Sequence, residues 1–211
     1  MRITKFTHAC VRLERDESVL VIDPGSFSER GALDGADAIL LTHEHIDHAE
    51  PERIAEIVKE RGIPVFAHPG VAAALPEITS LITTVQPGES IEAAGFAVSA
   101  HGGAHQIIHP DIPRVPNLAW LVTADDTNVY HPGDSFAIPD GVDVDTLFLP
   151  ISGPWMRMAE AVDFAREINP RRAFALHEAL LSDIGIAVVG RNMERLLDCE
   201  YTRLQPGTTV S

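Results

Sequence analysis

Apolar and polar positions alternate along the start of the chain with the period of a β-strand. Residues 2–7, 9–14 and 18–23 combine this alternation with β-branched or leucine side chains, which predicts three short strands. Residues 37–42 (DAILLT) form a continuous apolar run instead, which is typical of a strand buried on both faces. The chain therefore opens with strands joined by tight turns.

Four later segments show the spacing of an amphipathic helix. The first begins at Pro51, which suits a first helical turn, and stops at Gly62, with an apolar stripe between them. The same spacing predicts helices over residues 70–75, 158–168 and 191–197. The helices thus lie between and after the strands.

The remaining strands are expected at residues 63–67, 90–93, 96–100, 118–123, 128–131, 145–150 and 173–176. The strands form two clusters, and this order favours two packed sheets flanked by helices over one strictly alternating parallel sheet. Residues 102–117 form a long loop between them, and long loops inside compact domains are often functional. We expect a single α/β domain that spans residues 1–211.

Charge and composition narrow the possible partners. The chain carries 31 acidic and 16 basic residues, a net charge of −15, and an acidic protein repels a polyanion at long range. We therefore expect a small-molecule substrate and no nucleic acid.

Two cysteines suit a reducing compartment. Without an apolar signal segment or a run of ~18 apolar residues, the expected location is the cytoplasm, away from the membrane. The sequence does not specify an oligomeric state.

The strongest chemical signal is THEHIDH, at residues 42–48, directly after the strand expected at 37–42. Three histidines and two acidic residues crowd into six positions at the end of that strand. Imidazole nitrogens and carboxylate oxygens are the usual ligands of catalytic zinc, manganese or iron. The motif therefore predicts a metal centre.

This motif resembles the H-x-H-x-D-H hallmark of the metallo-β-lactamase superfamily. Three further segments are similar to motifs of that family: VIDPG at residues 21–25, HPGDS at 131–135 and LHEAL at 176–180. The branch that contains the ascorbate-6-phosphate lactonase is the most similar. The resemblance implies an α/β fold of four layers, an αβ/βα sandwich of two mixed sheets flanked by helices, which agrees with the pattern of strands and helices.

The resemblance also implies a site for two divalent metal ions. Its expected ligands are His43, His45 and His105 for the first ion, Asp47, His48 and His177 for the second, and Asp134 as the bridge between them. Zinc is the expected metal, and manganese or iron suits the same ligands. Asp47 and Asp134 are the expected catalytic residues.

The third histidine of the first ion has three candidates, which all lie in or beside the loop at 102–117. The segment GGAHQIIHPDIP resembles a family pattern in which the histidine after the glycine pair is the ligand, and this favours His105. His101 is the alternative. His109 is expected to line the pocket or to contact substrate.

Four residues outside the ligand set are also assigned expected roles. Asp23 is expected to orient a ligand histidine, with the capping of a turn as the alternative. His8 is expected on a strand surface, with a place facing the site as the alternative, and His68 is expected in a turn. Trp155 walls the substrate pocket or packs in the core.

Two such ions share a water molecule and lower its pKa enough to yield hydroxide near neutral pH. That metal-bound hydroxide would attack an ester-like carbon, and Asp47 could pass the proton to the leaving group. We expect a hydrolase of small ester-like substrates, with a lactone favoured by the resemblance. The alternatives are a phosphodiesterase of small metabolites, a mononuclear-iron oxygenase on the same fold and a non-catalytic metal-binding protein.

Overall fold

The computed structural model of the chain describes residues 1–76 and 78–211. Within these residues, two mixed sheets of seven strands each pack face to face. The first sheet contains, in spatial order, β14 (Thr208–Val210), β1 (Arg2–Lys5), β2 (Val11–Arg15), β3 (Ser18–Ile22), β4 (Ala38–Leu40), β5 (Val65–Ala67) and β6 (Ile82–Thr84). The second contains β13 (Glu200–Thr202), β12 (Arg172–Leu176), β11 (Thr146–Pro150), β10 (Thr127–His131), β9 (Leu118–Ala124), β8 (Phe96–Gly102) and β7 (Ser90–Ala93).

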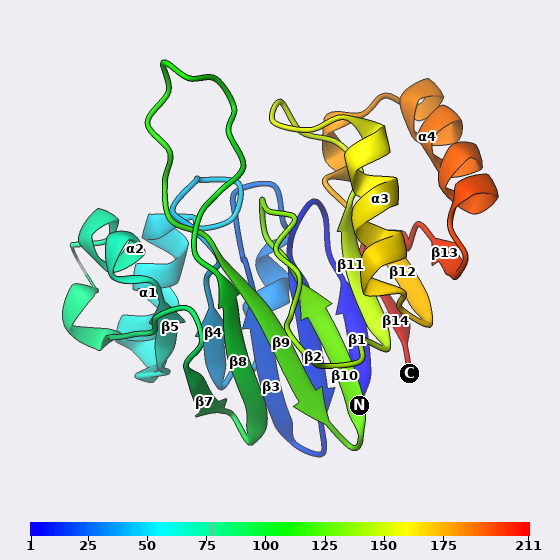
Figure 1. Cartoon of the computed structure of the whole chain (residues 1–211). Coiled ribbons are helices and arrows are strands. Elements are labelled where there is room, and N and C mark those ends of the chain that lie inside the picture. Colours follow the sequence, from blue (N-terminus) through cyan, green and yellow to red (C-terminus); the bar gives the residue numbers. More distant parts are fainter. Residues whose placement is uncertain (77) are drawn as a thin grey trace.

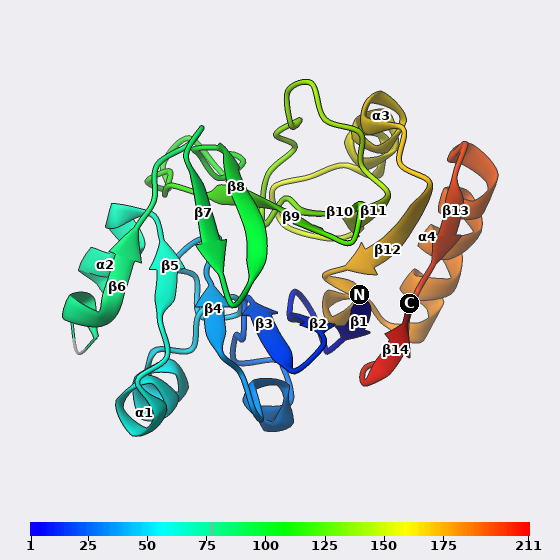
Figure 2. The same cartoon turned by 90° about the horizontal axis from the view of Figure 1, so that it is seen from below.

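Helices form the two outer layers (Figures 1 and 2). The α-helices are α1 (Pro51–Arg61), α2 (Pro69–Ala74), α3 (Met158–Ile168) and α4 (Asp183–Leu196), and the short 3-10 turns are η1 (Arg30–Leu33), η2 (Thr79–Leu81) and η3 (Glu178–Leu180). Side chains of α1 and α2 pack on the outer face of the first sheet, and those of α3 and α4 on that of the second. The predicted four-layer αβ/βα sandwich is confirmed.

The alternation of side chains along each strand builds these layers. On β3, Leu20 and Ile22 point into the core between the sheets, whereas Val19 and Val21 point toward the helices of the first sheet. The core between the sheets is filled mainly by large side chains, among them Phe96, Trp120, Phe148 and Phe174. Since both faces of the central strands are covered, these strands are apolar throughout, as the sequence predicts.

Several elements differ from those predicted. Helix α4 begins at Asp183, eight residues before the predicted start, because Ser182 caps it by accepting a hydrogen bond from the backbone N–H of Gly185. Two glycines and several β-branched residues in that first half hide its helical spacing. Strands β6, β13 and β14 were not predicted; each has three residues, too few for alternation to be visible.

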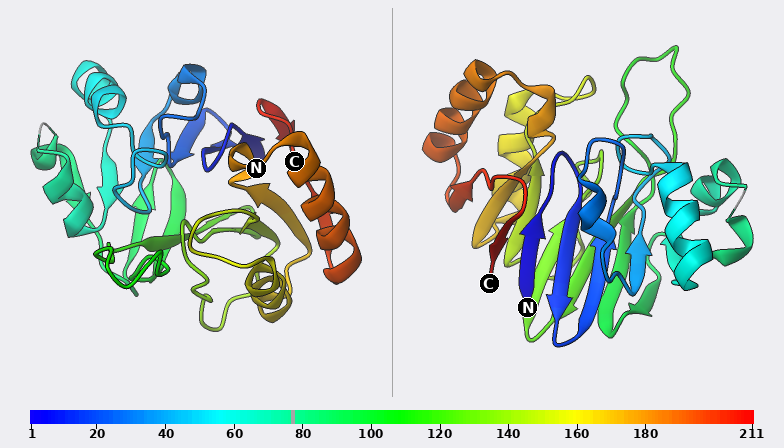
Figure 3. Two further views of the ribbon diagram at one scale, coloured as in Figure 1. Left: turned by 90° about the horizontal axis from the view of Figure 1, so that it is seen from above. Right: turned by 180° about the vertical axis from the view of Figure 1, so that it is seen from behind.

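Both termini lie together, at the end of the sandwich opposite to the loop of residues 103–117, which is green in Figure 1. Strand β14 reaches this place by pairing with β1, with Ile3 opposite Val210. Figure 3 shows the same arrangement from above and from behind. In residues 1–76 and 78–211, no helix combines the length and the apolar character that a membrane crossing needs.

Candidate metal centre

The residues predicted as ligands lie at one rim of the sandwich. Strands β1, β3 and β4 run in the same direction in the first sheet, as do β8, β10 and β12 in the second, so each set ends at one edge. His43, His45, Asp47 and His48 follow β4, His105 follows β8, Asp134 follows β10 and His177 follows β12. The fold thus brings side chains from distant parts of the sequence to one place.

Two groups of side chains form there. We call His43, His45 and His105 the first histidine group; one nitrogen of each lies within 4.8 Å of the others and of an oxygen of Asp134. We call His8, His48 and His177 the second histidine group, whose nitrogens meet the same limit. Four ligand atoms in the first case and three in the second lie close enough to enclose a cation, because imidazole nitrogens and carboxylate oxygens are common metal ligands.

The carboxylate of Asp134 lies between the two groups. Its Oδ2 is 3.1 Å from Nε2 of His105, in the first histidine group. Its Oδ1 is 3.0 Å from Nε2 of His48 and 3.1 Å from Nε2 of His177, in the second. One oxygen therefore faces each group, as in a carboxylate that bridges two ions.

Unsatisfied polar atoms at this place fit a cation. Among the described residues, Nε2 of His48, Nε2 of His177, Oδ1 of Asp134 and Nδ1 of His8 are buried and have no hydrogen-bond partner. Buried polar atoms without partners are rare in folded proteins because desolvation is costly. A divalent ion would satisfy several of them at once, so the donor set suits metal binding.

The three histidines considered for the third ligand of the first ion lie in different surroundings. His105 is buried within the first histidine group. The ring of His101 accepts or donates a hydrogen bond with Oγ of Ser99 at 2.9 Å, outside both groups. His109 is exposed and lies 3.5 Å from the carboxylate of Asp111. The structure therefore places His105, and neither alternative, beside Asp134.

His8 belongs to the cluster, and the expectation that it lies on a strand surface was wrong. Strand β1 ends at Lys5, so strand alternation does not apply to His8, which adopts a left-handed backbone conformation with φ of 67°. Its side chain is buried and its Nε2 lies 2.9 Å from Oδ2 of Asp47. In the sequence, the polar pair Thr7–His8 between two apolar strands is the feature that could have indicated this position of His8.

Asp47 lies at the edge of the cluster rather than inside either histidine group. Burial alone raises the pKa of its carboxyl, but the hydrogen bond from His8 and the nearby charge of His48 lower it to about 2. The carboxyl of Asp134 behaves similarly: burial opposes ionisation, and His177 and His48 hold its pKa well below the ordinary value. Both acids are therefore carboxylates, the form that binds cations.

Asp23 orients the second histidine group, as predicted. Its Oδ2 lies 2.7 Å from Nδ1 of His48, so that Nε2 of this ring faces Asp134. The backbone N–H and the hydroxyl of Thr42 donate to the same carboxylate at 2.8 and 2.6 Å. Such outer partners fix the ring orientation of a ligand histidine. His68, predicted in a turn, is instead the N-cap of α2, where its side chain accepts a hydrogen bond from the N–H of Gly70.

A buried ion pair ties two of the turns together. Nζ of Lys5 lies 3.0 Å from Oε1 of Glu178 and donates to the carbonyl of His8 at 2.7 Å. Glu178 also accepts a hydrogen bond from the N–H of His8 and directly follows His177. Both members of the pair are almost fully buried. The pair thus fixes the turn after β1 against the turn after β12.

We call residues 42–48, which carry the THEHIDH motif, the metal loop. The turn after β3 approaches this loop closely because Gly25 has no side chain. A Cβ at this position would overlap the backbone of Asp47 and of His48. Arg53, on α1, holds the turn from the other side by donating to the carbonyls of Pro24 and Gly25 at 2.6 and 2.8 Å. The VIDPG motif therefore has a packing role next to the cluster.

A cavity of about 180 Å³ opens beside the cluster. Polar residues of both histidine groups form one side of it, together with Asp47 and Asp134. Trp155 forms part of the wall and donates its indole N–H to Oδ2 of Asp134 at 2.7 Å. Of the two roles weighed for Trp155, the wall of the pocket is confirmed.

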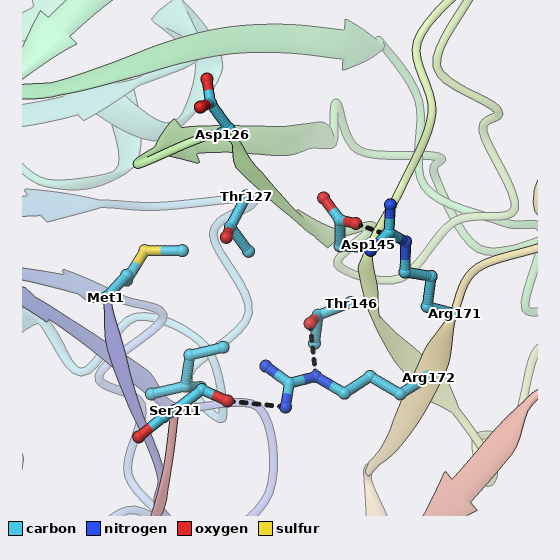
Figure 4. Close-up of a pocket in the computed structure, with 9 residues that line it drawn as sticks. Met1, Asp126, Thr127, Asp145, Thr146, Arg171, Arg172 and Ser211 are labelled. Atoms are coloured by element: carbon cyan, nitrogen blue, oxygen red, sulfur yellow. Dashed lines mark hydrogen bonds and ion pairs between the residues drawn. The ribbon is translucent and has the colours of Figure 1, made fainter.

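A larger cavity, of about 370 Å³, lies at the opposite end of the sandwich, near both termini (Figure 4). Its cationic groups are already engaged: Arg172 donates to Oγ1 of Thr146 and to the carbonyl of Ser211, both at 2.8 Å, and Arg171 pairs with Asp145 at 3.0 Å. None of the described residues that line it is a histidine. The smaller cavity, which is lined by residues of both histidine groups, is therefore the candidate active site.

Comparisons with known proteins agree with this geometry. A sequence profile described as "Beta-lactamase superfamily domain" matches residues 2–177. The chain belongs to the metallo-β-lactamase superfamily. The resemblance to the lactonase branch stays a prediction.

Three similar proteins illustrate the membership. Protein Rv0786c of Mycobacterium tuberculosis is 36% identical over 186 residues, which cover 86% of this chain and 86% of that protein. A UPF0173 metal-dependent hydrolase of Methanosphaerula palustris is 28% identical over 189 residues, 84% of this chain and 83% of that protein. The structure of the metallo-β-lactamase fold protein YhfI of Bacillus subtilis superposes with a TM-score of 0.77 at 17% identity, covering 99% and 98% of the two chains; it shows the shared fold.

Gly25→Ala is expected to lower the free energy of unfolding by about 3 kcal/mol, because the added Cβ overlaps the backbone of the metal loop. Denaturation with urea measures the change. The control is Gly190→Ala on α4, where the new Cβ meets no atom within 4 Å and helix propensity favours alanine by about 0.5–1 kcal/mol. A Gly25→Ala protein as stable as the wild type would show that the turn does not approach the loop so closely.

Lys5→Met is expected to lower the free energy of unfolding by about 3–5 kcal/mol, because it leaves the carboxylate of Glu178 buried without a cation. The double variant Lys5→Met with Glu178→Leu should recover most of this loss, since both charges are gone. Arg157→Met, which removes the exposed partner of Glu160, is the control and should leave stability nearly unchanged. A double variant less stable than Lys5→Met alone would refute the assignment.

Proposed function

We propose that this metal-dependent hydrolase of the metallo-β-lactamase superfamily holds two divalent ions and cleaves small ester-like molecules, with a lactone as the favoured substrate. One observation carries the proposal: the carboxylate of Asp134 presents one oxygen to each histidine group, at 3.0–3.1 Å from the nearest imidazole nitrogens. A single metal site would have no use for the second group, in which one buried nitrogen of each ring, Nδ1 of His8 and Nε2 of His48 and His177, has no hydrogen-bond partner.

The proposed ligands follow from this arrangement. The first histidine group would hold one ion, and His48 and His177 of the second group would hold the other together with Asp47, with Asp134 shared by both. His8, also of the second group, contacts the Asp47 carboxylate through a hydrogen bond of 2.9 Å and would keep it in place. Zinc is the proposed metal, because nitrogen and carboxylate ligands without thiolate suit it, and manganese or iron is compatible with the same set.

The ions would supply Lewis-acid polarisation of the scissile group and would lower the pKa of the attacking water. Side chains of the protein would transfer the proton, orient the groups and exclude solvent. Asp47, at the open edge of the cluster, accepts the water proton on its carboxylate and returns it to the leaving oxygen. Its hydrogen bond with His8 holds the carboxylate toward the cavity, and Trp155 closes one wall against solvent.

The chain's most buried thiol offers no alternative nucleophile. Cys10 is fully buried, and burial raises the pKa of its thiol to about 12. A protonated, inaccessible thiol neither attacks a substrate nor binds an ion at neutral pH. This supports hydrolysis by an activated water and disfavours a covalent enzyme intermediate at this residue.

Metal content of substituted proteins tests the proposal. Wild-type protein purified without chelator should contain about two ions per chain by elemental analysis, as two-metal hydrolases do. His43→Ala and His177→Ala should each lose about one ion, because they remove ligands of different sites, and Asp134→Ala should lose both. Hydrolysis of lactones should disappear on dialysis against a chelator and return on addition of zinc, manganese or iron.

The matched control is His101→Ala, which removes a histidine near the rim but outside both groups and should retain both ions and full activity. Equal metal content in His43→Ala, His177→Ala and wild type would refute the two-ion site. One iron per chain, together with oxygen consumption, would favour the oxygenase instead.

A further inference from the structure

The cavity beside the cluster has apolar residues in its lining. Besides the cluster residues, it is lined by Ile108, Gly153, Pro154, Trp155 and Leu180. None of the described residues that line it is a lysine or an arginine. The part of a substrate that extends beyond the scissile group therefore meets hydrocarbon surface and no cation.

Large exposed apolar side chains lie on the segments that carry the cluster. We call Phe27, Ile46, Ile107, Ile112 and Leu180 the apolar collar; all five are large and exposed, with Ile46 60% and Ile107 58% accessible. Each lies in a segment that follows a strand ending at the rim of the cluster, whereas the other large exposed apolar side chains among the described residues lie elsewhere. Because apolar patches on soluble proteins often mark binding sites, the collar is a candidate surface for an apolar group.

The collar residues lie near the cluster, either in space or along the chain. The ring of Phe27 lies edge-on to that of His8, with 5.1 Å between their centres. Ile46 stands between two predicted ligands in the metal loop, and Leu180 lines the cavity itself. Residues 107 and 112 belong to the green loop that rises from the rim in Figure 1.

The base of that loop is fixed to the site. The N–H of His105 donates to the carbonyl of Val115 at 3.0 Å, and the N–H of Gln106 donates to the carbonyl of Asp134 at 2.8 Å. These bonds fix the base of the loop, and Ile108 of the same loop lines the cavity. The loop that carries Ile107 and Ile112 is thus anchored beside the cavity.

The charges near the cavity do not suit a second anionic group on the substrate. Arg114 is the single basic residue in the segment 102–117, and its Nε donates to the backbone carbonyl of His105. Asp47 adds negative charge at the open edge of the cavity, and the whole chain carries a net charge of −15. None of the described residues that line the cavity is a lysine or an arginine, so a distal phosphate or carboxylate inside it would lose hydration without gaining a cation.

We infer that the substrate is an uncharged carboxylic ester or lactone with a hydrocarbon chain that packs on Ile108, Leu180 and the apolar collar; this rests on the proposed function. Water oxygen bonds to the carbonyl carbon and the bond from that carbon to the leaving oxygen breaks. One water proton passes to the leaving oxygen to give the alcohol, and the other leaves with the carboxylic acid, which ionises to carboxylate.

A series of γ-lactones tests the inference on the zinc-loaded protein. The probes are γ-butyrolactone, homologues with alkyl side chains of increasing length, and a γ-lactone whose chain of matched length ends in a carboxylate. The value of kcat/KM should rise by about twofold to fourfold for each added methylene, because each one is withdrawn from water. The carboxylate-terminated lactone should be a poorer substrate than its alkyl counterpart.

Substitutions in the apolar collar test whether it causes the dependence of kcat/KM on chain length. Ile107→Ser and Leu180→Ser should each lower the gain in kcat/KM per methylene. Val142→Ser, which changes an exposed valine in the segment that leads into the amino end of β11, is the matched control and should keep the full gain. If Ile107→Ser and Leu180→Ser leave the chain-length dependence intact, the collar is not the binding surface.

A binding measurement complements turnover. Trp155 lines the cavity, so the alkyl lactone should change its fluorescence saturably in metal-free protein, and Trp155→Phe should abolish the change. If the zinc-loaded protein hydrolyses no member of the series, the proposed function fails and the inference with it. If it hydrolyses all members equally, or prefers the carboxylate, the apolar substrate class alone is overturned.

Discussion

The carboxylate of Asp134, buried between two sets of imidazoles, is the interaction on which the site depends. A buried carboxylate and buried imidazoles are costly to remove from water, and the cost is met only where they have partners. Here Nε2 atoms from both groups approach the two oxygens of one side chain, while several of the same atoms lack hydrogen bonds. The arrangement is therefore suited to binding a cation.

The surrounding fold keeps these groups in place before any ion binds. Asp23 holds the ring of His48 through Nδ1, and the buried Lys5–Glu178 pair joins the turns that carry His8 and His177. These contacts are made by residues outside the proposed ligand set. Because they constrain the turns at the strand ends, they hold the residues of the cluster close to one another.

Much of the candidate site could be predicted from the sequence because its proposed ligands lie at the ends of recognisable strands. The apolar run before THEHIDH predicted where His43 lies, and the glycine pair predicted His105 beside it. His8 was missed because its turn begins three residues after the end of β1, where side-chain alternation carries no information. Strand β14 was missed for a related reason: its pairing with β1 joins the two ends of the chain, and three residues leave no pattern.

The central claim is that Asp134 lies between two ions, and anomalous diffraction from crystals grown with zinc tests it most directly. Data collected on both sides of the zinc absorption edge should show two peaks, one against the first histidine group and one against His48 and His177, with the Asp134 carboxylate between them. A single peak that leaves either histidine group without metal in zinc-rich crystals would contradict the account.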